Sequence, residues 1–249
     1  YSNLMNCPIV IDKILHLKVE FVANYLNSEI VDDPPKTGSF ITIANEMLTF
    51  NSYLDDELRS LSIDFLSGPI GWRLNRSQHE KHIKKALGKS LNPLNIFDAT
   101  AGMLADTMIF LSLDHKVVAC EQSKIIYLLI KDACERAKTS LPFLDNLTLL
   151  NGDARDIYNE KKDIDYDVIY LDPLYPKTNK ASKGSGEIDL LRKIIDLEGI
   201  KDAGDSIFNT FQSANCKKII LKRPIKAPLI CNKINYQIKG KSTRFDIYI

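Results

Sequence analysis

Apolar and polar residues alternate along the chain in blocks that favour strands and helices in turn. From residue 94 onward, four short apolar runs rich in β-forming residues predict strands: Leu94–Phe97, His115–Cys120, Leu147–Leu150 and Val168–Leu171. Stretches with helical spacing follow the first, second and fourth of these runs: Thr107–Leu113, Lys124–Lys138 and Glu187–Leu197. Strands that alternate with helices predict an α/β fold with a doubly wound parallel sheet and right-handed crossovers.

Two further β-like runs close the chain after a strand at Lys217–Lys222. They are Lys233–Lys239 and Thr243–Ile249, and only a few residues separate them. Such a short connection predicts an antiparallel hairpin. We therefore expect a Rossmann-like sheet with an antiparallel hairpin at its C-terminal edge.

The first part of the chain follows a different pattern. Pro8–Ile11 predicts a strand, Ser39–Ser52 predicts a hairpin, and Leu61–Leu66 predicts another strand that the glycines and proline of Gly68–Gly71 interrupt. The periodicity then predicts a helix over Ser77–Leu87.

These patterns divide the chain into two parts. We expect a small N-terminal α+β lobe over residues 1–70 and the doubly wound domain over residues 71–249.

The most distinctive chemistry follows the run Val168–Leu171. The segment Asp172-Pro173-Leu174-Tyr175-Pro176 comes at once, and its two prolines prevent a helix from starting there. Ligands of an open α/β sheet bind at the carboxyl ends of its strands. The Asp172 carboxylate and the Pro173 carbonyl can accept N–H bonds, and the Tyr175 ring can stack, so the loop suits a planar group with an exocyclic amine. The alternative is a rigid proline turn capped by Asp172.

Other strand ends offer room for a ligand with a ribose. Asp98 closes the first run, and small residues that include Gly102 follow it, which lets a ligand approach the backbone beside the start of a helix. Glu121 ends the next strand about 20 residues later, where a carboxylate can bind ribose hydroxyls. Asp153 lies just beyond the third strand. These strand ends predict a single pocket.

The glycine content selects among ribose-containing ligands. A nicotinamide dinucleotide calls for Gly-x-Gly-x-x-Gly, whereas this turn has only Gly102, so a pyrophosphate cradle is poorly supported. S-adenosylmethionine carries a ribose and no pyrophosphate. The missing glycines, together with the loop Asp172–Pro176, which we call the amine-binding loop, therefore favour S-adenosylmethionine as the cofactor.

The net charge of +1 conceals three basic clusters. Residues 73–89 hold six bases and only one acid, residues 217–244 hold nine bases and no acid, and lysines follow the amine-binding loop directly. A basic stretch is often only a solvated face. Three of them beside one pocket favour a phosphate-rich substrate. We expect contacts with it from Arg76, Lys177, Lys180, Lys222, Arg223 and Arg244.

Composition excludes several other classes. With 249 residues, 45% of them hydrophobic, the chain can bury a substantial core. It has no run near 18 apolar residues and no signal-like N-terminus, so we expect neither a membrane span nor secretion. Its five scattered cysteines include no Cys-x-x-Cys pair, which predicts reduced thiols in the cytoplasm and no metal site.

Four blocks of the sequence resemble, in order, the RsmJ family. They are Asp98–Gly102, Tyr170–Pro176, Lys222–Pro224 with Ala227-Pro228, and Lys239-Gly240 followed by Arg244–Tyr248. Members are bacterial S-adenosylmethionine-dependent methyltransferases that modify the N2 amine of a guanine in 16S ribosomal RNA. The resemblance therefore implies a Rossmann-like methyltransferase domain, with 16S ribosomal RNA or the small ribosomal subunit as partner and RNA as the phosphate-rich substrate.

The strand ends already point to Asp98 and Gly102 as cofactor-binding residues. The resemblance implies further cofactor contacts at Ala105, Asp106, Glu121, Gln122, Asp153, Ala154 and Asp172. Some of these positions depart from the family. Ala105 and Gln122 stand where arginines are expected, and Asp153-Ala154 replaces two serines. An alanine can contact the cofactor only through its backbone.

The implied mechanism is direct methyl transfer to the guanine N2. Asp172 and the Pro173 carbonyl would accept the N–H bonds and hold the nitrogen in line with the methyl group, and Tyr175 would stack on the base. Two alternatives use the same residues. One is an N-methyltransferase of other RNA, DNA or small molecules, and the other is a non-catalytic RNA-binding factor in ribosome assembly.

Overall fold

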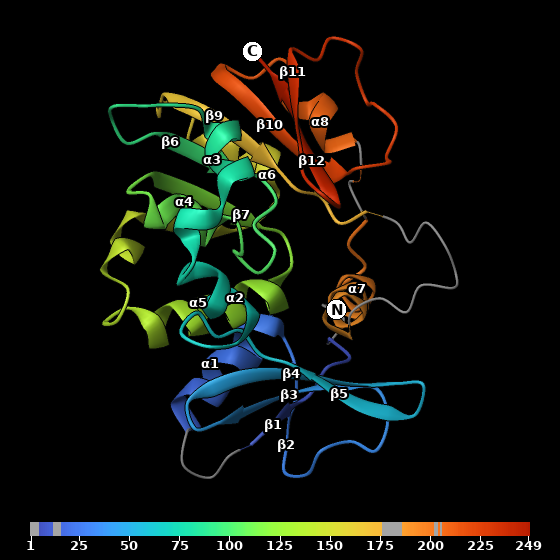
Figure 1. Ribbon diagram of the computed structural model, residues 1–249. Coiled ribbons are helices and arrows are strands. Elements are labelled where there is room, and N and C mark those ends of the chain that lie inside the picture. Colours follow the sequence, from blue (N-terminus) through green and yellow to red (C-terminus); the bar gives the residue numbers. More distant parts are fainter. Residues whose placement is uncertain (1–4, 12–15, 176–185, 202–203, 205) are drawn as a thin grey trace. The chain divides into compact units, whose positions relative to one another are not determined.

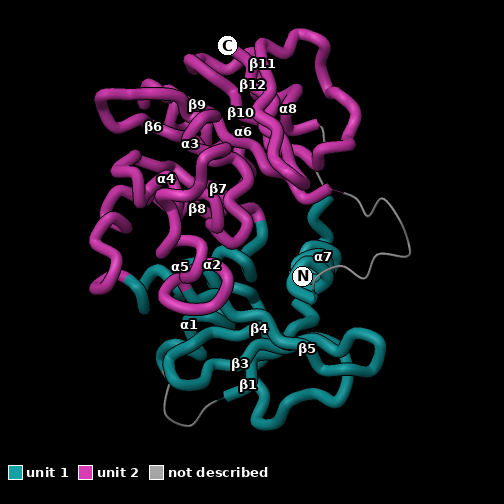
Figure 2. Tube along the Cα trace, viewed as in Figure 1, with its two compact units in different colours: residues 1–64, 123–137, 177–201 teal, residues 65–122, 138–176, 202–249 magenta. Residues whose placement is uncertain are grey.

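The computed structural model describes residues 5–11, 16–175, 186–201, 204 and 206–249 (Figure 1). The chain forms two compact units, each built from three segments. Unit 1 comprises residues 1–64, 123–137 and 177–201, and unit 2 comprises residues 65–122, 138–176 and 202–249 (Figure 2). The division into continuous domains 1–70 and 71–249 stays a prediction.

Unit 1 contains a five-stranded sheet in the order β2-β1-β3-β4-β5. Its strands are β1 (Ile9–Val10), β2 (Ile30–Val31), β3 (Ser39–Ala44), β4 (Met47–Leu54) and β5 (Glu57–Leu61). Its helices are α1 (His16–Leu26), α5 (Lys124–Ala137) and α7 (Gly186–Leu197). The predicted hairpin is confirmed as β3 and β4, and Asn45 and Glu46 connect them with φ of 51° and 63°.

The predicted strand Leu61–Leu66 is wrong, because β5 ends at Leu61. The actual strand, Glu57–Leu61, pairs with β4 alone among the described strands and so lies at the edge of the sheet, and most of its side chains are exposed or half-buried. An edge strand of this kind has few apolar residues, so the hydrophobic pattern pointed to the more apolar residues just after it.

Helix α5 is fastened to the small sheet by one buried acid. Asp132 is 3% exposed, and its Oδ2 accepts a hydrogen bond from the Leu48 amide of β4 at 3.2 Å. It also forms ion pairs with Lys18 of α1 at 2.5 Å and with Arg136 at 2.9 Å. The second segment of unit 1 is thus tied to the first by side chains from two helices and one strand.

Unit 2 contains a seven-stranded sheet in the order β11-β12-β10-β9-β6-β7-β8 (Figure 1). Its strands are β6 (Asn95–Asp98), β7 (Lys116–Glu121), β8 (Leu147–Asn151), β9 (Tyr166–Leu171), β10 (Cys216–Pro224), β11 (Tyr236–Lys239) and β12 (Thr243–Tyr248). The first five are parallel, and β12 runs antiparallel to β10 and β11. This confirms the doubly wound α/β sheet with its C-terminal hairpin.

The two faces of this sheet are covered by different helices. On one face, Phe97 and Leu221 share a buried cluster with Ile157 of α6 (Ala154–Glu160) and Phe208 of α8 (Ser206–Phe211). On the other face, Tyr170 packs edge-on against Phe110 of α4 (Thr107–Ser112), with ring centroids 4.9 Å apart. Strand side chains alternate between the two faces. Cys120 of β7 belongs to the cluster on the first face and is 1% exposed, as expected for a cysteine within an apolar strand.

The segment before β6 differs from its prediction. Residues Gly68–Leu74 form α2, because Pro69 occupies the first turn, where its missing N–H costs nothing. The single helix expected over Ser77–Leu87 is a 3-10 turn, η1 (Ser77–His79), followed by α3 (Lys81–Leu87), since Glu80 has non-helical φ and ψ of −72° and 57°. A second short 3-10 helix, η2 (Pro142–Asn146), precedes β8.

None of the helices within the described ranges is long and apolar enough to cross a membrane.

Candidate active site

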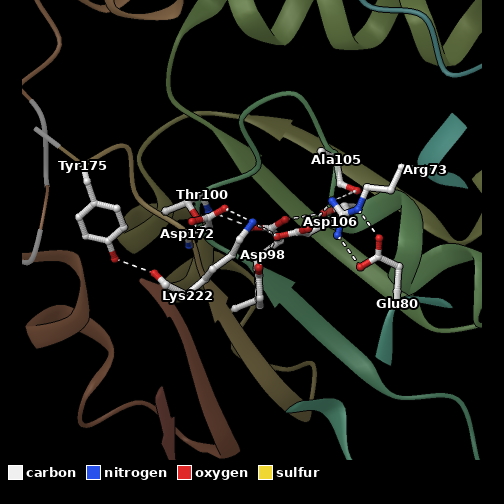
Figure 3. A network of polar contacts seen from close by, with 11 residues as sticks. Arg73, Glu80, Asp98, Thr100, Ala105, Asp106, Asp172, Tyr175 and Lys222 are labelled. Atoms are coloured by element: carbon white, nitrogen blue, oxygen red, sulfur yellow. Dashed lines mark hydrogen bonds and ion pairs between the residues drawn. The ribbon is translucent and has the colours of Figure 1, made fainter. Parts of the chain in front are cut away.

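The strand register places Lys222 beside Asp172. Leu221 of β10 pairs with Leu171 of β9, so the residues that follow each of them are neighbours on parallel strands. The Lys222 Nζ lies 2.8 Å from Oδ2 of Asp172 (Figure 3). The Asp172 amide donates a hydrogen bond of 2.6 Å to Thr100 Oγ1, which ties the loop after β9 to the loop after β6.

The carboxylate of Asp106 is contacted by three other side chains of the same network. Its side chain is 6% exposed, and Lys222 Nζ lies 2.8 Å from its Oδ2, to which the Tyr170 hydroxyl also donates a hydrogen bond. Its Oδ1 lies 2.6 Å from Arg73, the α2 arginine that also binds Glu80 and the Ala105 carbonyl. Figure 3 shows this chain of contacts running from Arg73 through Asp106 and Lys222 to Asp172.

Asp98 lies behind this network at the end of β6. Its carboxylate accepts hydrogen bonds from the Thr100 amide, at 3.1 Å, and from the Thr107 hydroxyl, and it is 2% exposed. Burial raises the pKa of Asp98 to about 7, although these two hydrogen bonds act in the opposite direction. Asp98 therefore titrates near neutrality.

The carboxylates of Asp106 and Asp172 have pKa values shifted in opposite directions. Burial alone would raise the pKa of Asp106, but the charges of Lys222 and Arg73 outweigh it and lower that pKa to about 2. Burial raises the pKa of Asp172, opposed by the Lys222 charge and reinforced by that of Asp106. For Lys222, the two carboxylates outweigh burial and raise the pKa of the ammonium.

Another carboxylate of the site, that of Glu121, lies at the end of β7. Glu121 is the last residue of β7, and its Oε2 accepts a hydrogen bond of 3.0 Å from the Gly102 amide. Gly102 has a left-handed φ of +51° and nothing nearer than 3.8 Å to the place of a Cβ, so the backbone is open to a ligand there. Gln122 is exposed.

The predicted cofactor residues after β8 have local roles. Asp153 caps α6 through the Arg155 amide at 2.8 Å and pairs with the Arg155 guanidinium at 2.9 Å. Ala154 is buried at the first position of that helix. The structure thus brings together Asp98, Asp106 and Asp172, and places Glu121 with Gly102.

Tyr175 is held by its hydroxyl as well as by its ring. The hydroxyl donates a hydrogen bond of 2.7 Å to the Lys222 carbonyl, and the Arg223 guanidinium lies 5.3 Å from the ring centroid. In addition to the ring that the sequence singles out for stacking, the hydroxyl of Tyr175 thus anchors the loop after β9 to β10.

Three residues expected to bind phosphates point into the protein instead. Lys222 is engaged with two carboxylates, and Arg223 is 2% exposed. Arg244 is 3% exposed, binds Asp246 at 2.8 Å and donates hydrogen bonds to four backbone carbonyls between residues 224 and 228. The prediction for these three is corrected, because Arg223 and Arg244 are buried within the fold and the half-buried Lys222 is already paired with two carboxylates.

The other predicted phosphate contacts differ in status. Arg76 is exposed, with its guanidinium 4.7 Å from the centroid of the Trp72 ring. Lys177 and Lys180 lie outside the described residues.

Several residues of the network do not stand out in the sequence. Arg73 appears only as one member of a basic cluster, and Thr100 and Tyr170 appear only as parts of motifs. Periodicity offers one signal for Tyr170, since it lies two residues before Asp172 and so on the same face of β9. No sequence signal joins Arg73 to Asp106, 33 positions away, because that contact depends on how α2 packs near α4.

A cavity of about 490 Å³ lies elsewhere, at the opposite edge of the sheet. It is lined by residues at the beginning of β6, β7 and β9, such as Asn95, Lys116 and Tyr166. It shares no residue with the network around Asp172.

Comparisons with known proteins agree with this arrangement. The model of a family described as putative S-adenosylmethionine-dependent methyltransferases matches residues 27–249. The chain belongs to this family. Among its relatives, ribosomal RNA small subunit methyltransferase J of Desulfotalea psychrophila is 30% identical over 97% of this chain and 94% of its own. The same enzyme of Francisella philomiragia is 33% identical over 84% and 87%. The resemblance to the RsmJ family is thereby confirmed.

A solved structure supports the fold of this methyltransferase. A crystal structure of an S-adenosylmethionine-dependent methyltransferase from Neisseria gonorrhoeae superposes with a TM-score of 0.72. The two chains are 25% identical, and the match covers 97% of this chain and 95% of the other. The chain is therefore an S-adenosylmethionine-dependent methyltransferase with a Rossmann-like sheet.

Proposed function

We propose that this methyltransferase acts in the bacterial cytoplasm on 16S ribosomal RNA and transfers a methyl group to the N2 amine of one guanine. The observation that carries this proposal is the loop Asp172–Tyr175 at the point where the strand order reverses between β6 and β9, which is where open α/β sheets bind ligands. The names of the two relatives, both ribosomal RNA small subunit methyltransferases, support the RNA substrate.

The residues at this edge fit S-adenosylmethionine. The Glu121 carboxylate, at the end of β7, would accept hydrogen bonds from the ribose hydroxyls. The open backbone at Gly102 would allow the cofactor to lie close to the loop after β6. Gln122, Asp153 and Ala154, beyond the ends of β7 and β8, would border the adenine. When bound, this cofactor supplies an electrophilic methyl group on a sulfonium.

The loop after β9 would prepare the amine. The guanine N2 is a poor nucleophile because its lone pair is delocalised into the ring. Asp172 and the Pro173 carbonyl would accept its two N–H bonds, which increases electron density on nitrogen and aligns the lone pair with the methyl carbon. The transfer would leave a neutral thioether on the cofactor, and the methylated nitrogen, whose N–H protons become acidic, would release one of them to solvent. Tyr175 would stack against the base.

A basic rim lies near the same edge of the sheet and would bind the phosphates. We use this name for Arg76, Lys81, Lys239 and Lys241, all of which are exposed. The strand register pairs Pro224 with Thr243, so the turn between β11 and β12 lies beside the end of β10. Glu80, the acid next to Lys81, is neutralised by Arg73 at 2.7 Å. Four cations without a competing acid suit an RNA backbone.

Trp72 adds an aromatic surface to this rim. Its side chain is 62% exposed, although a tryptophan usually lies mostly buried, and Arg76 lies over its ring. An exposed indole beside an arginine suits stacking with a base of single-stranded RNA.

The experiment that tests the proposal is methyl transfer to small subunits or naked 16S ribosomal RNA from cells that lack the enzyme. The wild-type protein should produce N2-methylguanine at one site, identified by mass spectrometry of RNA fragments. Asp172→Asn should slow transfer by about 100-fold or more, the scale for one contact in a preorganised site. Asp167→Asn is the matched control, because this acid lies in β9, the strand that leads to Asp172, and pairs with Lys217 away from the site. A methylated product other than N2-methylguanine would contradict the proposal.

A further inference from the structure

We propose that Lys222 is a positioning residue: its ammonium fixes one oxygen of Asp172 and directs the other toward the amine that is methylated. This role rests on the proposed function, because it concerns the same amine-binding loop. It replaces the contact with RNA phosphate that the charge pattern suggested for Lys222.

The geometry begins with the sheet. Lys222 and Asp172 follow directly paired positions of two parallel strands, so their side chains emerge on the same face. The Lys222 Nζ reaches Oδ2 of Asp172 and Oδ2 of Asp106, each at 2.8 Å (Figure 3). An ammonium has three donors in all, and these contacts use two of them on two different loops. Only 21% of the Lys222 side chain is exposed, so an RNA phosphate has little access to it.

The contact leaves Asp172 with one oxygen to offer. Among the described residues, none donates a hydrogen bond to its Oδ1, while Oδ2 is held by Lys222. The side chain is 34% exposed, in contrast to Asp106 at 6%. Asp172 is thus the member of the network that a substrate can reach, with one acceptor fixed and one available.

The charge of Lys222 also keeps Asp172 in its accepting form. The groups around Asp172 are Lys222 on β10, Asp98 on β6, Tyr170 on β9, Asp106 before α4, and Arg73 on α2. Burial and Asp106 favour the protonated carboxyl, whereas Lys222 and Arg73 favour the carboxylate. Arg73 already lies against Asp106 Oδ1, so Lys222 supplies the only direct ion pair to Asp172 among the described residues. The carboxylate is acceptor-only at both oxygens, whereas the protonated carboxyl carries an O–H donor on one of them.

A purely structural role, joining β9 to β10, is the competing explanation. Both roles place the Lys222 charge beside Asp172 and so affect the pKa of Asp172, but only the positioning role requires the pH dependence of methyl transfer to move with that pKa. The pKa of Asp172 is therefore measured first, without substrate, and then compared with the pH dependence of the rate.

The test is a ¹³C NMR titration of the protein with labelled aspartate. In Lys222→Met, the pKa of Asp172 should rise by about 1–3, the effect of removing an opposite charge at this distance. In Lys222→Arg, which keeps the positive charge, the pKa of Asp172 should return most of the way to its wild-type value. Lys222→Gln provides a second neutral variant if the methionine variant does not fold. Lys217→Met is the matched control, since Lys217 lies on the same strand and pairs with Asp167 at 2.7 Å.

The pH dependence of methyl transfer is the second measurement. The acidic limb of the rate should move to higher pH in Lys222→Met, because more alkaline conditions are then needed to ionise Asp172. Burial also raises the pKa of Asp98 to about 7, so Asp98 could itself contribute to the acidic limb of the pH–rate profile. An acidic limb that persists in Asp98→Asn belongs to Asp172. An unchanged pKa of Asp172 in both neutral variants, or a rate lowered equally at every pH, would overturn the proposal.

Failure of the proposed function would look different. If the wild-type protein methylated another amine, the RNA assay would fail while the NMR titration and the pH profile with that amine would still test Lys222.

Discussion

Tyr175, in the loop after β9, makes one contact through its ring and another through its hydroxyl. Its ring faces the Arg223 guanidinium at 5.3 Å, and its hydroxyl bonds to the carbonyl of Lys222 at 2.7 Å. The backbone that accepts this bond belongs to the lysine that holds Asp172. Movement of Tyr175 therefore affects the stacking surface and the end of β10 together.

Tyr175→Phe should slow methyl transfer by about 2-fold to 10-fold, since one neutral hydrogen bond contributes about 0.5–1.5 kcal/mol. Tyr175→Ala should have a larger effect, because stacking on a base contributes about 1–3 kcal/mol in addition. Single-turnover rates measure both. Tyr158→Phe removes a comparable hydroxyl bond, to the Asn215 carbonyl at 3.1 Å, and should leave the rate unchanged. Equal losses in Tyr175→Phe and Tyr175→Ala would mean that the hydroxyl, and not the ring, is what the reaction needs.

At the scale of elements, α5 depends on an acid that the hydrophobic pattern does not reveal. Asp132 lies on a helix whose other buried residues are apolar, such as Leu128 and Ile130. It contacts α1, β4 and the last turn of its own helix. The elements of unit 1 are therefore fixed to one another by polar contacts as well as by the apolar core.

Asp132→Ala should lower the free energy of unfolding by about 3 kcal/mol, the lower end for a broken buried pair, because both cationic partners remain partly exposed. Urea denaturation measures this change. Asp145→Ala is the control, since its pair with Lys138, at 4.0 Å, is largely exposed and should contribute little. A similar, small change in both variants would show that the Asp132 contacts are not needed for stability.

At the scale of the whole molecule, the near-neutral charge is distributed unevenly. Residues 73–89 and 217–244 together contain fifteen of the 33 bases and one acid. The fold buries some of these bases, among them Arg223 and Arg244, and leaves others on the basic rim. The surface available to RNA is therefore smaller than the sequence suggests.

Alanine at Lys81 and Lys241 should weaken RNA binding and make it less dependent on salt. The slope of log affinity against log salt should fall in magnitude by about 0.7 for each phosphate of a single strand that these lysines no longer neutralise. Fluorescence anisotropy with an RNA fragment across a salt series measures this slope. Alanine at Lys116 and Lys162, two exposed lysines near the amino ends of β7 and β9, removes the same charge and should leave the slope unchanged. Equal effects of the two pairs would show that binding follows net charge and not the basic rim.

The sequence by itself determined the sheet and the edge at which its strand-end acids lie. The runs before Asp98, Glu121 and Asp172 are locally apolar and β-rich, so they form strands, and parallel topology brings their ends to one edge. The glycine-poor turn favoured S-adenosylmethionine, and family membership confirms that cofactor. These conclusions needed only short-range patterns and the rule that parallel strands align.

Only the tertiary structure decided which charges face the site and which are buried. A run such as Lys222-Arg223 looks uniformly basic, yet in a strand its two side chains point to opposite faces. One of them meets Asp106 and Asp172, which lie 116 and 50 residues away in the sequence. Arg244 is likewise buried by Asp246 and by carbonyls about 20 residues earlier. Charge counts carry no information on these partners, because strand register and helix packing fix them through contacts distant in sequence.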